Sequence, residues 1–426
     1  MNDLSYLKRQ FKEYYKENQK KVPIVNSFEK REFGFIPWDQ QIRMIRHIGY
    51  SKHEQFLIQL SNNGPRHIYA SGSLYLKPEI QNMENKDFQG CDFIVDIDVD
   101  HFYTPCKEDH DFWYCKECGK NGKGMVEKCP DCGKSKLKKL TWICEKCLNI
   151  AKKEITKMND FLLNDFNIDI GKIKIAFSGH RGYHLKAEDK ALRSLSSDER
   201  REIVDYLTGE NISFEILGLR EIGGNVFGLS KQTIGWPRKI IRKIEEILDM
   251  PNLAIESLLS DKSVFNLPRH FIENLINSKD QLLKTIREDK NNNWTLVSSN
   301  INLWYKFLEA LVKEIGIKLD APVSIDIHRL IRYPGSLHGS TGFKVQELLF
   351  DELDLFNPLD EQIEKLDPIV FMSKVKTIQK IEITEPIVPL TKIKGETFGP
   401  YKSGEKIEVP HHIAIFLLCK GVAKSI

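Results

Sequence analysis

The sequence predicts an α/β protein built from mixed β-sheets flanked by helices, with a helical subdomain and an inserted zinc-binding module. Within the stretch Cys91 to Asp100, apolar and acidic residues alternate strictly from Val95 to Asp100, the two-residue period of a strand that packs on a core. Seven of the nine cysteines lie between Cys106 and Cys147, at spacings typical of a metal site. Apolar residues recur at helical spacing through much of residues 190–316.

The composition is that of an ordinary globular protein. Apolar residues make up 41% and charged residues 29% of the 426 residues, enough for two or three domains. The net charge of +3 excludes a global attraction to nucleic acid, so a basic groove would have to be local. We find no apolar signal segment and no run near the ~18 apolar residues of a membrane span, so we expect a cytoplasmic protein without a membrane partner.

The acidic run is the most informative stretch. As a strand it places Asp96, Asp98 and Asp100 on one face, opposite an apolar face that includes Phe93 and Val95. Carboxylates two positions apart lie about 6.7 Å from each other and repel by roughly 2–3 kcal/mol at an effective dielectric constant of ~20. Divalent ions would neutralise this repulsion. The alternative is the solvated face of an amphipathic strand, although Asp is disfavoured in strands.

Cysteine and histidine pairs in residues 106–147 predict structural zinc. Such pairs can surround a tetrahedral Zn²⁺ ion, and eight ligands allow two four-coordinate, non-catalytic sites. An inner set, with ten residues between its two pairs, has the spacing of a zinc ribbon, and an outer set would close a second site. The inner set is Cys115, Cys118, Cys129 and Cys132, and the outer set is Cys106, His110, Cys144 and Cys147. Sequential pairing, which would join the first four ligands of the chain in one site, is the alternative.

A short strand at residues 173–177 leads into a second candidate site. It follows a helix expected at residues 148–166 and ends in Ser178-Gly-His180-Arg181-Gly-Tyr-His184. A glycine-bracketed turn exposes backbone N–H groups, and Arg181 and His184 add donors, so the turn suits an anion. The alternative is a surface turn with incidental basic residues.

The remaining chain combines helices with one further polar cluster. Ser196 and Glu199 form a capping box that begins a helix, and an apolar stripe that includes Trp304 ends at Gly316. Carboxylates, arginines and a histidine then crowd into residues 320–339. Past residue 380 we expect short strands, with a closing helix over residues 413–421.

Three motifs stand in order along the chain: Asp96-Ile-Asp98, Ser178 to His184, and Arg332-Tyr-Pro-Gly-Ser-Leu-His338. Together they resemble the small catalytic subunit of archaeal and eukaryotic DNA primase, and the resemblance covers essentially the whole chain. It implies the prim fold of the archaeo-eukaryotic primase superfamily. The implied organisation is a catalytic prim domain at residues 1–105 and 148–189, a zinc module at 106–147, a helical subdomain at 190–316, and completion of the prim domain by 317–426.

The resemblance also implies a function and a set of site residues. The function is template-directed, de novo synthesis of short primers on single-stranded DNA during replication, by a nucleotidyltransferase. Asp96, Asp98 and Asp320 would bind two Mg²⁺ or Mn²⁺ ions, Asp320 being preferred to Asp326 because it lies twelve residues before Arg332. The residues implied to hold the incoming nucleoside triphosphate are Ser178, His180, Arg181, His184, Arg332, His338 and Arg46, with Glu32 as a weaker candidate.

The chain differs from the family pattern at two places. The resemblance also implies a partner subunit. His180 stands where many members have an arginine, and the inner cysteine ribbon resembles an insertion into a single zinc site. Only Cys419 follows Cys147, too few ligands for an iron–sulfur cluster, which implies a heterodimer with the large primase subunit that carries one. A nucleoid-associated location is implied. The alternatives are a superfamily polymerase for end-joining or damage bypass, and a non-catalytic zinc-ribbon protein that binds nucleic acid.

Overall fold

The computed structural model describes residues 3–39, 41–288, 292–372 and 377–426. The chain forms two compact units, each assembled from segments that are distant in sequence. Unit 1 comprises residues 1–155, 169–200 and 319–426, and unit 2 comprises residues 156–168 and 201–318. All the candidate site residues belong to unit 1. The predicted α/β class is confirmed.

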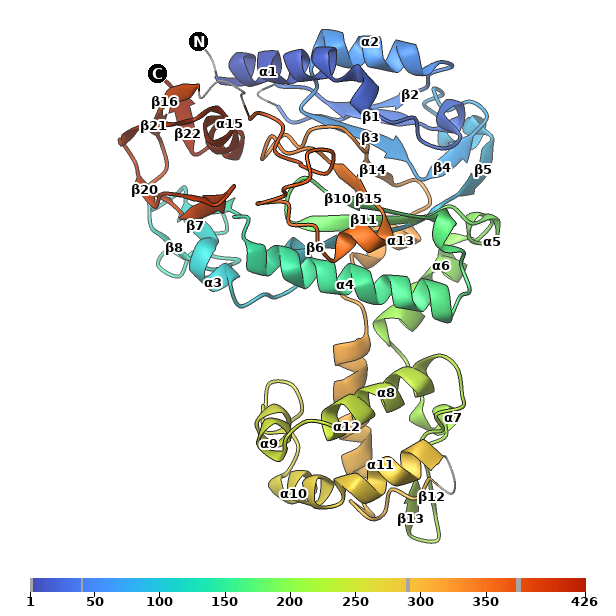
Figure 1. Cartoon of the computed structure of the whole chain (residues 1–426). Helices are drawn as coiled ribbons and strands as arrows, with labels where there is room; N and C mark the ends of the chain where they lie inside the picture. The colour runs from blue at the N-terminus through green and yellow to red at the C-terminus, as the bar shows by residue number, and fades with distance from the viewer. Residues whose placement is uncertain (1–2, 40, 289–291, 373–376) are drawn as a thin grey trace. The chain divides into compact units, whose positions relative to one another are not determined.

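The first sheet of unit 1 is antiparallel and has the strand order β14-β3-β1-β2, with α1 and α2 lying over it (Figure 1). These elements are α1 (Asp3–Glu17), β1 (Phe33–Ile36), β2 (Ile45–Ile48), α2 (His53–Asn63), β3 (His67–Ser71) and β14 (Leu330–Arg332). The Phe56 ring of α2 lies 5.0 Å from the Phe33 ring and 4.8 Å from the Tyr333 ring, between centroids. Because Tyr333 directly follows β14, this aromatic packing holds the end of β14, and with it Arg332, in place.

The second sheet is also antiparallel, with the order β15-β10-β11-β6. Its strands are β6 (Phe93–Asp98), β10 (Ile173–Phe177), β11 (Gly182–Ala187) and β15 (Gln346–Leu348). The strand expected at residues 173–177 is therefore confirmed. Strand β6 carries Asp96 and Asp98 and pairs with β11, and in the described part of the chain it forms one edge of the sheet.

The acidic run is not one continuous strand. It divides between β5 (Phe88–Cys91), which pairs with β4 (Ser73–Tyr75), and β6, with Asp92 between them. The buried Asp92 carboxylate binds Arg31 and Arg193, both at 2.6 Å, and this double ion pair accounts for the break. At the other end, the Asp98 side chain accepts the Asp100 N–H at 2.9 Å and begins a 3₁₀ turn, η4 (Val99–His101). Asp100 therefore leaves the strand, and the expectation of three aspartates on one strand face is wrong for Asp100.

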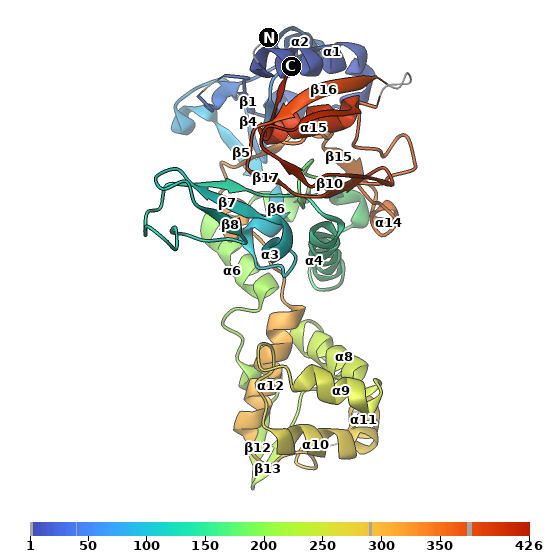
Figure 2. The ribbon, with the colours of Figure 1, turned by 90° about the vertical axis from the view of Figure 1, so that its left-hand side faces the viewer.

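The cysteine-rich segment forms a small module with its own three-stranded sheet, in the order β8-β7-β9. Its elements are α3 (Lys107–His110), β7 (Phe112–Cys115), β8 (Asn121–Lys123) and β9 (Leu137–Leu140). The module packs on the C-terminal segment, with β7 near β17 (Figure 2). Tyr114 Oη donates to the Ile387 carbonyl at 2.7 Å, and Trp142 Nε1 donates to Thr391 Oγ1 at 2.8 Å.

The C-terminal segment consists of short strands and a closing helix, as expected. They are β16 (Ile378–Ile383), β17 (Ile387–Val388), β18 (Thr391–Ile393), β19 (Glu396–Phe398), β20 (Tyr401–Lys402), β21 (Lys406–Pro410), α15 (His411–Lys420) and β22 (Ala423–Ser425). Three short helices complete unit 1: α5 (Lys190–Arg193), α13 (Ala321–Ile325) and α14 (Phe350–Leu353). The other 3₁₀ turns are η1 (Gln19–Lys21), η2 (Phe28–Lys30), η3 (Met83–Lys86) and η5 (Ile170–Lys172).

Unit 2 is mainly helical, with one β-hairpin. It contains α7 (Phe214–Leu217), β12 (Arg220–Ile222), β13 (Asn225–Phe227), α8 (Trp236–Leu248), α9 (Asn252–Leu259), α10 (Arg269–Asn277), α11 (Lys279–Glu288) and α12 (Ile301–Ile315). Helices α4 (Glu145–Asn164) and α6 (Ser197–Thr208) contribute residues to both units. The capping box of α6 forms, because the Ser196 N–H donates to Glu199 Oε2 at 2.8 Å and the Glu199 N–H to Ser196 Oγ at 3.3 Å.

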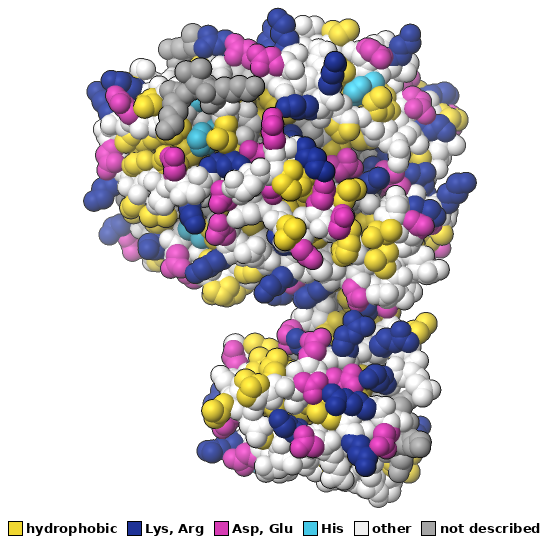
Figure 3. Space-filling model, in the orientation of Figure 1, with side chains coloured by type: hydrophobic (Ala, Val, Ile, Leu, Met, Phe, Trp, Pro, Cys, Tyr) yellow, Lys and Arg dark blue, Asp and Glu magenta, His cyan; other side chains and the backbone are white. Residues whose placement is uncertain are grey.

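Charge and apolar surface are distributed without a strong bias on the face shown in Figure 3. Lys and Arg side chains are interspersed there with Asp and Glu side chains, in agreement with the small net charge of +3. Within the described residues, no helix is both long enough and apolar enough to cross a membrane.

Candidate active site

The three carboxylates predicted from the sequence lie near the β6 edge of the second sheet, where the charge of Asp320 acts on Asp96 and that of Asp96 acts on Asp98. Among the described residues, however, the acidic group whose ligand atoms lie within 4.8 Å of one another is Asp98, Asp100 and His180, so convergence of the three predicted carboxylates on one ion stays a prediction. Asp96 and Asp98 lie on β6, and Asp320 lies directly before α13. The Asp320 backbone N–H donates to the Asp96 carbonyl at 3.0 Å, so the two segments are joined directly. Asp326, the other candidate for the third carboxylate, is exposed at the end of α13 and accepts the His328 N–H at 2.8 Å.

Burial and mutual repulsion act on the first two carboxylates. Burial, and then the charge of Asp320, raise the pKa of Asp96 to about 6. Burial and the charge of Asp100 raise the pKa of Asp98 to about 6. Asp96 Oδ1 is buried without a hydrogen-bond partner in the described structure, although His184 Nε2 lies 3.3 Å away. A buried, unpartnered carboxylate oxygen is costly unless a cation binds it, so the Asp96 carboxylate suits a hard cation such as Mg²⁺ or Mn²⁺.

The turn between β10 and β11 lies beside these carboxylates. His184 on β11 is the direct antiparallel partner of Asp96 on β6. Burial and the charge of Arg332 lower the pKa of His184 to about 3, so its imidazole is neutral. Gly179 has a φ of 83°, and a Cβ atom there would lie 2.6 Å from the Cβ of His338. Glycine permits this close approach, which brings the turn against the last motif.

His338 connects this turn to the first sheet. Its ring stacks on the His180 ring at 5.2 Å and 6°, and the His67 ring meets it edge-on at 4.9 Å. Arg332 Nη1 lies 2.7 Å from His67 Nδ1, and the guanidinium lies over the Tyr69 ring. Burial lowers the pKa of all three histidines well below its ordinary value. The neutral imidazoles can each donate one N–H, beside the guanidinium of Arg332.

Arg46 lies on β2 and is held by the buried carboxylate of Glu32. Arg46 Nε donates to Glu32 Oε1 at 2.9 Å, and Nη2 donates to the His328 carbonyl at 3.2 Å. Lys86 Nζ lies 3.1 Å from Glu32 Oε2. Glu32 therefore anchors two cations. Ser178 is buried, and its Oγ accepts the His180 N–H at 3.3 Å.

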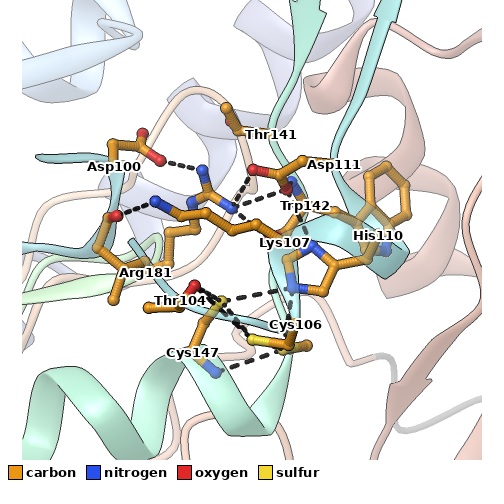
Figure 4. Close-up of polar contacts among 12 residues, drawn as sticks. Asp100, Thr104, Cys106, Lys107, His110, Asp111, Thr141, Trp142, Cys147 and Arg181 are labelled. Carbon is orange, nitrogen blue, oxygen red and sulfur yellow. Dashed lines mark hydrogen bonds and ion pairs between the residues drawn. The ribbon is translucent and has the colours of Figure 1, made fainter. Parts of the chain in front are cut away.

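Arg181 faces the zinc module instead of an open pocket. Its guanidinium is fully buried, and Nη1 donates to Asp111 Oδ1 at 2.8 Å, to Asp111 Oδ2 at 3.0 Å and to the Trp142 carbonyl at 2.9 Å (Figure 4). Nη2 pairs with Asp100, which had no expected role. These contacts engage both terminal nitrogens, so binding of a nucleotide by Arg181 stays a prediction.

The cysteines group as an inner and an outer set, not in sequential pairs. In the outer set, Cys144 Sγ and Cys147 Sγ lie 3.2 and 3.4 Å from His110 Nε2, and Cys106 Sγ lies 3.3 Å from Cys147 Sγ. In the inner set, the Cys115–Cys132 and Cys118–Cys129 Sγ pairs are both 3.6 Å apart. Tetrahedral Zn–S bonds of about 2.3 Å give S···S edges of about 3.8 Å, so both clusters can hold zinc.

Several residues of this region were not predicted from the sequence. Asp111 joins His110 to Arg181, His67 joins Arg332 to His338, and Lys420 Nζ lies 2.6 Å from His180 Nε2. Asp111 directly follows a predicted zinc ligand, and zinc-bound histidines commonly donate to a carboxylate, a signal that could have identified it. Nothing in the local sequence distinguishes His67 or Lys420.

The fold and the site together define a protein with acidic residues that could bind metal at the edge of an antiparallel sheet, next to cationic and imidazole donors. A model of the DNA primase small subunit family matches residues 128–349. The chain is 30% identical to the DNA primase small subunit PriS of Methanothrix thermoacetophila, covering 99% of this chain and 98% of that protein. The PriS proteins of Archaeoglobus fulgidus and Cenarchaeum symbiosum are 29% and 27% identical, over 98% and 99% of this chain and 97% and 99% of their own lengths. The chain belongs to the DNA primase small subunit family.

Proposed function

We propose that this chain performs the catalytic step of primer synthesis, by metal-assisted nucleotidyl transfer at the β6 edge. Its substrates would be nucleoside triphosphates and a single-stranded DNA template, and no primer would be needed to begin. The observation that carries the proposal is the junction of Asp320 with Asp96, two acidic residues distant in sequence whose backbones share a hydrogen bond of 3.0 Å. Neither alternative function is favoured by a specific contact.

Asp96, Asp98 and Asp320 would hold two Mg²⁺ or Mn²⁺ ions. When bound, such ions lower the pKa of an attacking hydroxyl and stabilise the charge that develops at the reacting phosphate. The carboxylates supply the negative charge for binding, and their repulsion in the free protein is relieved by a cation. The neutral His184 ring lies beside this carboxylate, with Nε2 3.3 Å from Asp96 Oδ1.

The rings of His67, His180 and His338 form a histidine cluster, and the polyphosphate of the incoming nucleotide would lie beside it. Arg332 and Arg46 supply permanent positive charge, which binds phosphate oxygens with charge-assisted hydrogen bonds. The neutral rings of His180 and His338 add donors without like-charge repulsion between them. Ser178 would add a hydroxyl, and we keep Arg181 in this set as a prediction.

Zinc and a partner subunit complete the proposal. Both cysteine clusters would hold structural Zn²⁺, with His110 Nδ1 bound by Asp111 at 2.9 Å as an outer partner. The chain would act as a heterodimer with a large primase subunit that carries an iron–sulfur cluster. Replication would place it in the cytoplasm, on the nucleoid.

De novo synthesis on single-stranded DNA with labelled nucleotides tests the proposal. The decisive variants are Asp96→Asn and Asp98→Asn, with Asp326→Asn as the matched control because Asp326 is an exposed aspartate next to the same helix. We expect no dinucleotide from the first two variants and wild-type synthesis from the control. Normal primer synthesis by Asp96→Asn would overturn the assignment.

A further inference from the structure

The last residue of helix α15, Lys420, points its ammonium group at the histidine cluster. Lys420 Nζ lies 2.6 Å from His180 Nε2 and donates to the Thr141 carbonyl at 2.8 Å. His180 is only 8% exposed, and its other face stacks on the His338 ring. Helix α15 therefore places a cation next to the turn that contains His180, in the motif Ser178 to His184.

The positive charges around this cluster are not neutralised by direct ion pairs. In the described part of the chain, no carboxylate oxygen lies within 4.0 Å of the Lys420 ammonium or the Arg332 guanidinium, and both contact imidazole nitrogens instead. Arg66, on the other side of the cluster, has a buried Nε without a hydrogen-bond partner and lies over the Trp38 ring. Gly339, one residue after His338, lies directly against the Arg66 side chain.

Such an arrangement is costly in the free protein. Burial, opposed in part by Asp100, Asp111 and Asp98, lowers the pKa of Lys420 to about 7, while Arg181 acts in the same direction as burial. The neutral acceptors and aromatic rings around Lys420 and Arg332 replace part of the lost hydration, but no direct ion pair balances the two charges. An anion bound between them would restore the lost interactions, and the phosphate chain of a nucleotide carries enough oxygens to do so.

We propose that Lys420 is a nucleotide-binding residue that contacts the polyphosphate of the incoming nucleotide together with His180 and Arg332. The inference rests on the proposed function and deepens it. Lys420 supplies a positive charge beside the neutral His180 ring. The C-terminal helix thereby becomes part of the substrate pocket, although it is distant in sequence from every motif of the site.

Binding of inorganic triphosphate, measured by calorimetry without DNA or divalent ions, tests the inference. The variant Lys420→Met keeps most of the side-chain volume and removes the charge, and Lys420→Gln also keeps a donor for the Thr141 carbonyl. The control is Lys424→Met, because Lys424 is exposed on β22 and pairs with Glu382 at 2.9 Å. One charge-assisted hydrogen bond to phosphate corresponds to a loss of affinity of about 10- to 100-fold.

We expect that loss in both Lys420 variants, and an increase of similar size in the KM for nucleotide during primer synthesis, with kcat changed less than threefold. The control should match the wild type in both assays. Wild-type triphosphate affinity in either folded Lys420 variant would overturn the inference, as would an unchanged KM. Triphosphate binding by a wild-type protein that makes no primers would instead contradict the proposed function, and the two failures are thus distinguishable.

Discussion

Arg181 and Asp111 form an ion pair in which both side chains are fully buried, with Nη1 at 2.8 Å from Oδ1. Asp111 Oδ1 also lies 2.9 Å from His110 Nδ1, in the outer cysteine cluster, and Arg181 also pairs with Asp100. A continuous chain of polar contacts therefore connects the outer cluster to the turn that follows the acidic strand. Such outer contacts orient a metal ligand and fix its tautomer.

We expect Asp111→Asn to destabilise the protein by about 1–3 kcal/mol, because it removes one of the two carboxylates that pair with the buried Arg181 guanidinium. Denaturant unfolding of the whole protein, followed by circular dichroism, measures the change. Asp109→Asn is the control, since Asp109 is exposed in the same short helix. Equal unfolding midpoints for Asp111→Asn and the wild type would show that the pair contributes nothing to stability.

Removing one ligand from each cysteine cluster should separate their roles. We expect two zinc ions per wild-type chain and one in each of Cys118→Ser and Cys144→Ser, measured by elemental analysis. Cys144→Ser should also reduce primer synthesis strongly, because the outer cluster is connected to Arg181 through His110 and Asp111. Cys118→Ser should leave a larger share of activity. Loss of both ions in either single variant would contradict two independent sites.

The buried Lys344 should make stability depend on pH in the alkaline range. Burial lowers its pKa from 10.5 to about 8, with Lys21 acting in the same direction. Between pH 8 and 10.5 the unfolded chain then binds more protons at this group, so its contribution makes the protein more stable as pH rises. Below pH 8 the cost of burying the charge is fully present.

We therefore expect Lys344→Met to stabilise the protein at pH 7 by on the order of 2 kcal/mol, and this gain to diminish by pH 10. Thermal unfolding at the two pH values measures it. Lys392→Met, at an exposed lysine of strand β18, should show no such pH-dependent difference. A gain that is the same at both pH values would rule out titration of Lys344 as its cause.

Local sequence patterns predicted several elements of the fold. The strand at residues 173–177, the capping box at Ser196 and the closing helix α15 all form, because each depends on contacts between near neighbours. The break in the acidic run was not predictable in this way. It depends on Arg31 and Arg193, which reach Asp92 from distant segments, and these ion pairs override the period-two pattern.

The candidate site likewise combines residues that the sequence predicted with contacts that only the folded chain creates. Motif spacing selected Asp320, and the structure brings it to Asp96. The environment of Arg181 could not be predicted, because its partner Asp111 lies in the inserted module and meets it only in the folded chain. Lys420 gave no local signal, since a lysine that ends an amphipathic or buried helix is common at helix C-termini.

The central claim is that Asp96, Asp98 and Asp320 together bind divalent cations. Manganese binding to the apo-catalytic site, followed by electron paramagnetic resonance with zinc retained, measures this most directly. We predict that Asp320→Asn lowers Mn²⁺ affinity at least tenfold and abolishes dinucleotide synthesis, while Asp326→Asn changes neither. Unchanged Mn²⁺ binding by Asp320→Asn, in a folded protein that still makes dinucleotides, would contradict the account.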